Sequence, residues 1–150
     1  MNTSRLGLAL MHLLAKLPLP VLRGIGWGVG RLLFILAAPR RKIALRNLEL
    51  CFPEVPAAQR RAWAKETFVV FCQTFIDRSW LWFGSEALVR SRVQLAGALH
   101  ELEGDTATIV FAPHFYSMHA GGLALPLNTP RERTSIFATN PDPVLDAWFM

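Results

Sequence analysis

Apolar residues in the first part of the chain recur with the period of a helix. Residues 3–16 predict an apolar helix that begins near Thr3 or Ser4. Pro18 and Pro20 interrupt this pattern, because proline cannot continue a helix from its interior. The apolar pattern resumes over residues 21–38 and predicts a second helix. No eighteen consecutive residues in this region are free of charge, so a membrane-spanning helix and a helix in the plane of the membrane both remain open.

Two further helices follow from the pattern of the next segments. Residues 40–50 predict a basic amphipathic helix that ends before Cys51. A long helix is predicted from Pro56, a good first-turn residue, to about Phe83. Bulky apolar residues occupy nearly all sides of this long helix, so much of it must be buried in protein or in lipid.

The second half of the chain alternates between helical and strand patterns. Ser85 is a suitable N-cap for a short helix that ends at Arg92. The continuous apolar run 107–112 predicts a buried central strand, which Pro113 ends. Other elements expected here are a strand at 93–95, a turn or short helix at 100–105, a helix at 114–125 and a strand at 133–138. This order predicts an α/β domain with a mostly parallel sheet behind N-terminal membrane-anchoring helices.

Charge is distributed unevenly along the 150 residues. Residues 1–48 carry eight basic residues and no acidic one, and the rest carries eight basic and eleven acidic residues. A basic apolar segment suits an anionic membrane surface, and nucleic acid is the competing partner. The basic residues stand among Leu, Ile, Val and Gly and not on a polar face with stacking aromatic residues, which favours the membrane and argues against nucleic acid.

Residues 1–39 therefore predict a membrane-anchoring region, and residues 40–150 predict part of a folded domain. Arg23, Trp27 and Arg31 recur every four residues on one helix face, as in a helix at a lipid interface. Four glycines give overlapping small-xxx-small spacings that permit close helix contact: Gly24, Gly26, Gly28 and Gly30. A cleaved signal peptide is the alternative, but a small-residue cleavage site is not evident. The apolar helical start at 142–150 lacks a stop signal, so we expect a truncated chain, with a genuinely short protein as the alternative.

The end of the predicted central strand is the place for chemistry. His114 comes two residues after that strand and at the start of the predicted helix. Ligands of open α/β sheets bind outside the carboxyl ends of strands, and a helix N-terminus disfavours protonation of an imidazole before reaction. From position alone, a general base and a structural histidine are both open. The sequence shows no metal-ligand spacing, and Cys51 and Cys72 read as small apolar residues in a reducing compartment.

Three ordered blocks resemble the family of lipid A late acyltransferases, the lauroyl and myristoyl transferases of the bacterial inner membrane. They are RKIALRNLELCFPE at 41–54, TIVFAPHFYSMHAGGLAL at 108–125 and IFATNPDPVLDAWF at 136–149. The resemblance covers the chain from about residue 5 and implies the N-terminal half of such an enzyme. In the family an apolar strand delivers a histidine, and an Asp or Glu follows after four intervening residues.

The resemblance implies a catalytic role for His114 as the general base. It would deprotonate a hydroxyl that attacks an acyl thioester. The family acid would orient this imidazole and stabilise its protonated form, but His119 stands at that position. A neutral His119 can accept a hydrogen bond yet supplies no negative charge. We therefore expect a severe loss of rate unless another acid substitutes.

Substrate-binding candidates flank this motif. Tyr116 and Ser117 lie beside His114, and either hydroxyl can line the site. The family's third block usually carries basic residues that suit phosphate, but residues 138–142 have none, so Arg131 and Arg133 are the expected substitutes. Asp142 or Asp146 is expected to cap the last helix and not to take part in catalysis.

The function implied is transfer of a fatty acyl chain from an acyl carrier protein thioester to a lipid A precursor, at the cytoplasmic face of the bacterial inner membrane. No cofactor and no metal are expected. Two alternatives stay open at this point. One keeps the chemistry but changes the acceptor to a lysophospholipid or another glycolipid, and the other is a truncated, non-catalytic relic that binds membrane.

Overall fold

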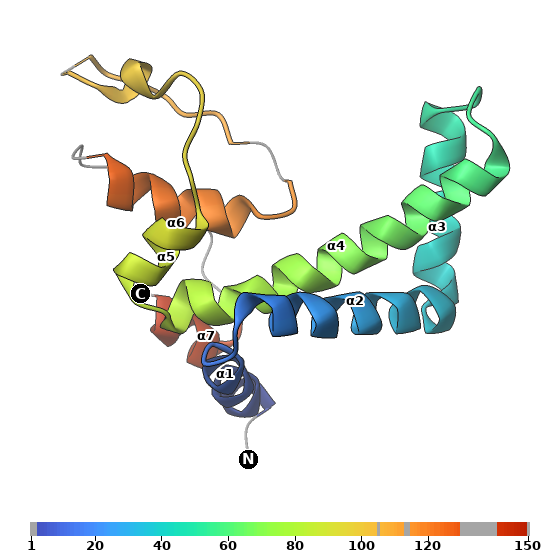
Figure 1. The fold of residues 1–150 in the computed structure, drawn as a ribbon, viewed down its shortest axis with the longest axis horizontal. Coiled ribbons are helices and arrows are strands. Elements are labelled where there is room, and N and C mark those ends of the chain that lie inside the picture. The colour runs from blue at the N-terminus through green and yellow to red at the C-terminus, as the bar shows by residue number, and fades with distance from the viewer. Residues whose placement is uncertain (1–2, 105, 113–114, 130–140, 150) are drawn as a thin grey trace. The chain divides into compact units, whose positions relative to one another are not determined.

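The structure is a computed structural model that describes residues 3–104, 106–112, 115–129 and 141–149. Within these ranges the chain forms helices joined by loops, and no residue is in a strand (Figure 1). The chain divides into two compact units, one of residues Leu17–Asp77 and one of Met1–Lys16 with Arg78–Met150. The expected boundary between an anchor at 1–39 and a domain at 40–150 stays a prediction.

The unit Leu17–Asp77 contains α2 (Leu19–Leu36), α3 (Ala38–Cys51) and most of α4 (Ala57–Phe83). The sequence predictions for these three helices are confirmed to within about two residues. Prolines stand in the first turns of α2 and α3, where the missing N–H would have no helical partner in any case. The break at Ala37 therefore separates two helices that would otherwise read as one apolar-to-basic run.

Two arginines hold the ends of these helices. Arg41 Nη1 donates to the carbonyl oxygens of Phe34 and Ile35, at 2.5 and 2.7 Å, in the last turn of α2. Arg60 Nη1 donates to three carbonyl oxygens of the loop between α3 and α4, including that of Val55 at 2.5 Å. The last carbonyls of a helix have no intrahelical partner, so charge-assisted donors of this kind stabilise the turns.

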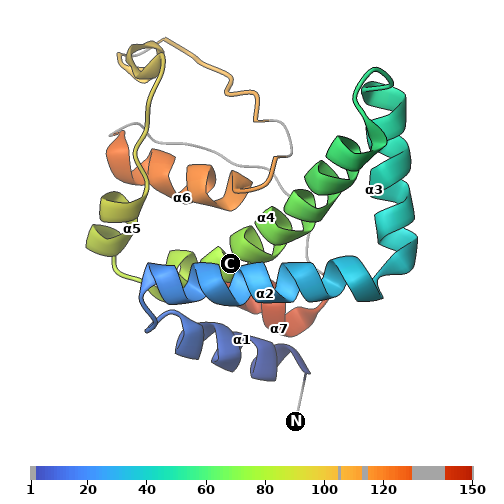
Figure 2. The same ribbon diagram turned by 45° about the vertical axis from the view of Figure 1, so that its right-hand side comes forward.

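Helix α2 packs closely against α4, and both views show the two helices side by side (Figures 1 and 2). A Cβ at Gly30 would lie 2.5 Å from the Cα of Val69, and one at Gly26 would lie 2.8 Å from the Cα of Gln73. Only glycine allows backbones to come this near. The expectation of close helix contact is confirmed at these two positions, whereas Gly24 and Gly28 face open space.

The other unit contains α1 (Thr3–Leu14), the end of α4, and four short helical segments. These are α5 (Glu86–Arg92), a 3-10 turn (Leu99–Leu102), α6 (Met118–Asn128) and α7 (Pro143–Phe149). Two predicted caps are confirmed: the Ser85 hydroxyl accepts from Leu88 N at 3.2 Å, and Asp142 Oδ1 accepts from Val144 N at 2.9 Å. The Ser4 hydroxyl also donates to Asp142, which joins α1 to α7 and lowers the pKa of that carboxyl.

The predicted α/β fold with a mostly parallel sheet is wrong for the described residues. Residues 106–112 are neither helix nor strand, and the expected buried strand is exposed, with Ile109 97% and Phe111 87% accessible. Residues 93–95 are also irregular. A strand is stabilised by hydrogen bonds from a second strand, and no described segment supplies them. The strand expected at 133–138 lies outside the described residues.

Candidate active site

The candidate site centres on the first turn of α6, where His119 is the second helical residue. Ser117 precedes the helix in the left-handed region at φ 69°, and its carbonyl accepts from Ala120 N at 2.8 Å. The helix begins at Met118 and not near residue 114 as expected. His119 thus lies in the first turn of a helix, which sets the direction of its Cα–Cβ bond.

His119 packs against the last turns of α4. Its ring stands edge-on to the ring of Trp82, with centroids 6.3 Å apart and planes at 88°. The guanidinium carbon of Arg78 lies 5.8 Å from the centroid of the same indole. Arg78 and Trp82 are four residues apart and therefore share one face of α4. These three side chains form what we call the Arg78–Trp82–His119 cluster, in which the His119 side chain is half-buried.

The surroundings of His119 favour the neutral form of its imidazole. Burial lowers the pKa of His119 below its ordinary value of 6.5, and repulsion from Arg78 lowers that pKa further. Burial also lowers the pKa of Arg78, but an arginine keeps its proton at neutral pH. The site therefore offers a neutral imidazole, which can donate one hydrogen bond and accept another, beside a fixed positive charge.

The other predicted site residues fall in two groups. Tyr116 and Ser117 lie in the turn immediately before α6, and both side chains are exposed. His114, Arg131 and Arg133 lie outside the described residues. The structure thus places three of the six predicted site residues in one short stretch, residues 116–119, and the pairing of His114 with His119 stays a prediction.

Sequence reasoning missed Arg78 and Trp82. Their four-residue spacing was visible, but it marks only a helix face. Nothing in the sequence connects that face with a histidine about forty residues later in the chain, because this contact depends on how α6 folds back onto α4.

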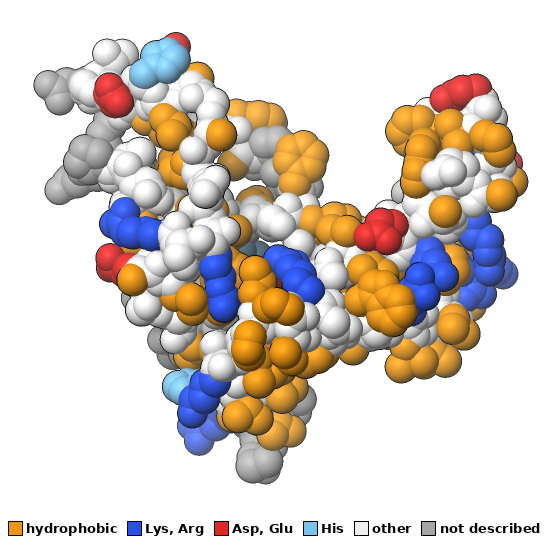
Figure 3. Space-filling model, viewed as in Figure 1, with side chains coloured by type: hydrophobic (Ala, Val, Ile, Leu, Met, Phe, Trp, Pro, Cys, Tyr) orange, Lys and Arg blue, Asp and Glu red, His pale blue; other side chains and the backbone are white. Residues whose placement is uncertain are grey.

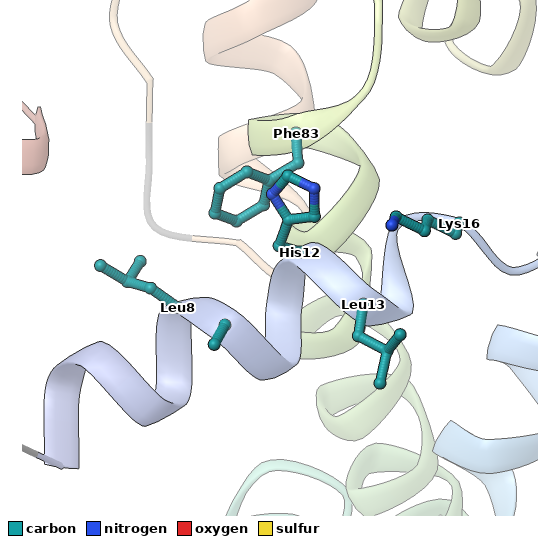
Figure 4. A pocket seen from close by; sticks show the side chains of 6 residues that line it. Leu8, His12, Leu13, Lys16 and Phe83 are labelled. Carbon is teal, nitrogen blue, oxygen red and sulfur yellow. The ribbon is translucent and has the colours of Figure 1, made fainter. Parts of the chain in front are cut away.

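An apolar groove also occurs in this unit, away from the predicted residues. It has a volume of about 510 Å³. Residues of α1, Lys16 just after that helix, and Phe83 line it: Leu8, Ala9, His12, Leu13, Lys16 and Phe83. Figure 4 shows the His12 imidazole beside the Phe83 ring, and their centroids lie 5.0 Å apart. Across the described ranges, no group of His, Cys, Asp and Glu is placed to hold a metal ion.

Comparison with known proteins identifies the family. The chain matches the family described as bacterial lipid A biosynthesis acyltransferase over residues 2–150. The chain belongs to this family. Three relatives show how far the similarity extends. A lipid A biosynthesis acyltransferase of Haemophilus influenzae is 32% identical over 145 residues, which are 94% of this chain and 46% of the relative.

The other two relatives are from Escherichia coli. Its lipid A biosynthesis lauroyltransferase is 26% identical over 144 residues, covering 94% of this chain and 46% of the relative. Its lipid A biosynthesis palmitoleoyltransferase is 30% identical over 132 residues, covering 85% and 43%. This member of the lipid A acyltransferase family therefore spans about half the length of the curated relatives it matches. No solved structure matches it.

Within this family, the Arg78–Trp82–His119 cluster marks the departure at the motif. The resemblance implies an acid at position 119, and the structure instead has a neutral imidazole next to a cation. The sequence from 106 to 131 contains no Asp or Glu. Position 119 therefore lacks the negative charge that the resemblance implies, and Arg78 adds a positive charge nearby.

Proposed function

We propose that this protein takes part in transfer of a fatty acyl chain from an acyl carrier protein thioester to a hydroxyl of a lipid A precursor. The proposed location is the cytoplasmic face of the bacterial inner membrane. The observation that carries the proposal is the family match over residues 2–150, together with relatives named for lauroyl and palmitoleoyl transfer. The eight basic residues within 1–48 support a place on an anionic membrane.

In the proposed reaction His114 accepts the proton of the acceptor hydroxyl. The hydroxyl oxygen then attacks the thioester carbonyl, the carbon–sulfur bond breaks, and the leaving thiolate takes the proton from His114. His119 would accept a hydrogen bond from His114 and hold its tautomer. Tyr116, Ser117, Arg131 and Arg133 would bind substrate, with the two arginines suited to phosphate.

His119 performs this role less well than a carboxylate. Removing the orienting carboxylate of a Ser-His-Asp system lowers kcat by about 10⁴. Here the positive charge of Arg78 additionally opposes formation of an imidazolium close to His119. A slow enzyme is therefore the expected form of this activity.

The neutral state of His119 beside Arg78 favours a second candidate, a non-catalytic protein that binds membrane lipid. A neutral His119 beside Arg78 lacks the negative charge that would stabilise a protonated His114, whereas a cation and exposed apolar side chains suit an anionic lipid. An acyltransferase with a lysophospholipid or another glycolipid as acceptor remains the alternative of the same chemistry.

Acyl transfer from a carrier-protein thioester separates these candidates. The assay compares wild type with His114→Ala, His119→Asp and the control His100→Ala, whose imidazole is exposed in a distant turn. We expect His114→Ala to abolish transfer, His119→Asp to raise kcat, and His100→Ala to change neither. Full activity of His114→Ala would contradict the proposed base. Vesicle binding without transfer in either wild type or His119→Asp would establish the second candidate. Transfer to a lysophospholipid but not to a lipid A precursor would show that the acceptor is a lysophospholipid and not the proposed lipid A precursor.

A further inference from the structure

The contacts between α2 and α4 extend over most of α2. Near its start, Arg23 Nη2 lies 2.8 Å from Asp77 Oδ2, a buried carboxylate. Gly26 and Gly30 then meet the backbone of α4, and near the end of α2 the rings of Phe34 and Phe68 pack at 5.5 Å. The two helices run antiparallel and are in contact along this length. Wherever α2 lies in a membrane, α4 must therefore lie beside it.

Helix α2 alone has the length and composition to cross a bilayer, and among the described residues it is the one such helix. Helix α4 has no uncharged stretch long enough to cross a bilayer. The stretch of α4 between the charged residues Glu66 and Asp77 has ten uncharged residues, 67–76. At about 1.5 Å per residue it reaches about 15 Å, half of a hydrocarbon core of about 30 Å. A spanning α2 would carry Lys65, exposed Glu66 and the Arg23–Asp77 ion pair into or against hydrocarbon.

The face of α2 that points away from α4 is apolar and accessible. The buried residues of α2 recur every four positions, at Leu22, Gly26, Gly30 and Phe34, and the last three of them meet α4. Beside and behind this buried face stand six exposed aliphatic residues, between 36% and 66% accessible: Val21, Ile25, Val29, Leu32, Ile35 and Leu36. We call these six residues the outer stripe. It runs from the first turn of α2 to its last, as a helix lying along a surface would require.

Charge next to the outer stripe indicates what covers it. Arg31 is exposed and its guanidinium carbon lies 4.1 Å from the centroid of Trp27, which is 49% accessible. On the following helix Arg40, Lys42 and Arg46 are also exposed. Figure 3 shows Lys and Arg side chains beside hydrophobic ones over α2 and α3. Apolar side chains bordered by arginine, lysine and tryptophan match the boundary between acyl chains and anionic headgroups.

We propose that α2 lies in the plane of one leaflet of an anionic bilayer, with its outer stripe in the acyl chains and α4 on the aqueous side, and does not cross the membrane. This inference rests on the membrane location in the proposed function and specifies its geometry. A surface-lying pair keeps the charges of α4 in water. It also leaves the Arg23–Asp77 pair, whose arginine side chain is 40% exposed, outside the hydrocarbon.

The depth of the outer stripe tests this geometry. In a Cys51→Ser, Cys72→Ala background, a fluorescent label is attached at Val21→Cys, Val29→Cys or Leu36→Cys, with Glu66→Cys as the control on α4. The protein is bound to vesicles of phosphatidylethanolamine and phosphatidylglycerol that carry a nitroxide near the headgroup or at the chain end. We expect the three α2 labels to share one depth, about 5–10 Å below the headgroup boundary, with about twofold stronger quenching by the shallow nitroxide. The Glu66→Cys label should not be quenched.

Each other outcome overturns the inference in a recognisable way. Deep quenching at Val29→Cys with shallow quenching at Val21→Cys and Leu36→Cys would show a spanning helix, and the membrane location would survive. Failure to bind the vesicles would remove the membrane location as well. A dimer in detergent-free buffer that buries the α2 labels would identify a second copy of the chain as the occupant of the outer stripe.

Discussion

At the scale of single residues, Arg78 changes what His119 can do. The imidazole and the guanidinium meet the same indole, that of Trp82, from two different helices. A histidine in water titrates near neutral pH, and here both burial and the neighbouring cation act against its protonation. The residue at this position is thus a hydrogen-bonding group without charge. The family resemblance, by contrast, implies a permanent anion there.

The protonation of His119 can be measured directly. We expect its imidazole to titrate below 6.5 in an NMR pH titration. Because the unfolded chain then binds a proton more readily than the folded one, stability should fall as the pH drops below 6.5 and be unaffected by this group well above it. Arg78→Gln should raise the pKa of His119, since it removes the repulsion. The control Arg90→Gln changes a cation on α5 that bonds to Asn128 and should leave that pKa unchanged. Equal effects of both substitutions would contradict the assigned cause.

At the scale of elements, the pairing of α2 with α4 depends on two glycines and one partly buried ion pair. Glycine in a helix interior costs about 0.5–1 kcal/mol relative to alanine. Gly26 and Gly30 offset this cost because they let the α2 backbone reach the α4 backbone, while Gly24 and Gly28 have no neighbour that would exclude a side chain. The same residue type therefore has opposite effects on different sides of one helix.

A matched pair of alanine substitutions tests this difference. Gly30→Ala places a Cβ 2.5 Å from the Cα of Val69, a backbone atom that cannot move aside, and should destabilise the fold by about 1–3 kcal/mol. Gly28→Ala meets open space and should stabilise α2 by about 0.5–1 kcal/mol. Denaturant midpoints of the two variants give the measurement. Stabilisation by Gly30→Ala would mean that α2 and α4 are not packed at this distance.

At the scale of the whole molecule, the basic first third and the rest of the chain differ in charge, and this asymmetry predicts how binding responds to salt. Deleting residues 1–39 would be a poor test, because α1 packs with α7 and α2 packs with α4 inside folded units. Substitution of exposed basic residues on α3 leaves those packed faces intact.

Arg40→Gln and Lys42→Gln should each weaken binding to anionic vesicles by about 1 kcal/mol, close to fivefold in affinity at low ionic strength. Added salt should weaken wild-type binding and reduce the difference between wild type and the two variants. Arg90→Gln serves again as the control and should bind like wild type. Co-sedimentation with vesicles of increasing phosphatidylglycerol content measures these affinities. If wild type binds neutral and anionic vesicles equally at low salt, the charge asymmetry does not direct it to membranes.

The sequence by itself determined most of the helices, their caps and the family. Proline at a first turn, Ser85 before α5 and Asp142 before α7 act on backbone groups within a few residues, so local sequence is sufficient to predict them. The ordered blocks at 41–54, 108–125 and 136–149 likewise identified the family, because a motif is recognised from the order of its residues and requires no knowledge of the fold.

Only the tertiary structure decided which glycines meet α4, that Arg78 and His119 meet the same indole, and that residues 106–112 form no strand among the described residues. Each of these depends on a partner distant in sequence. An apolar run with β-branched residues permits a strand, but its hydrogen bonds must come from another segment, so composition alone predicted one wrongly. A glycine repeat and an arginine–tryptophan spacing likewise mark a helix face, and the neighbour on that face is set by packing over the whole unit.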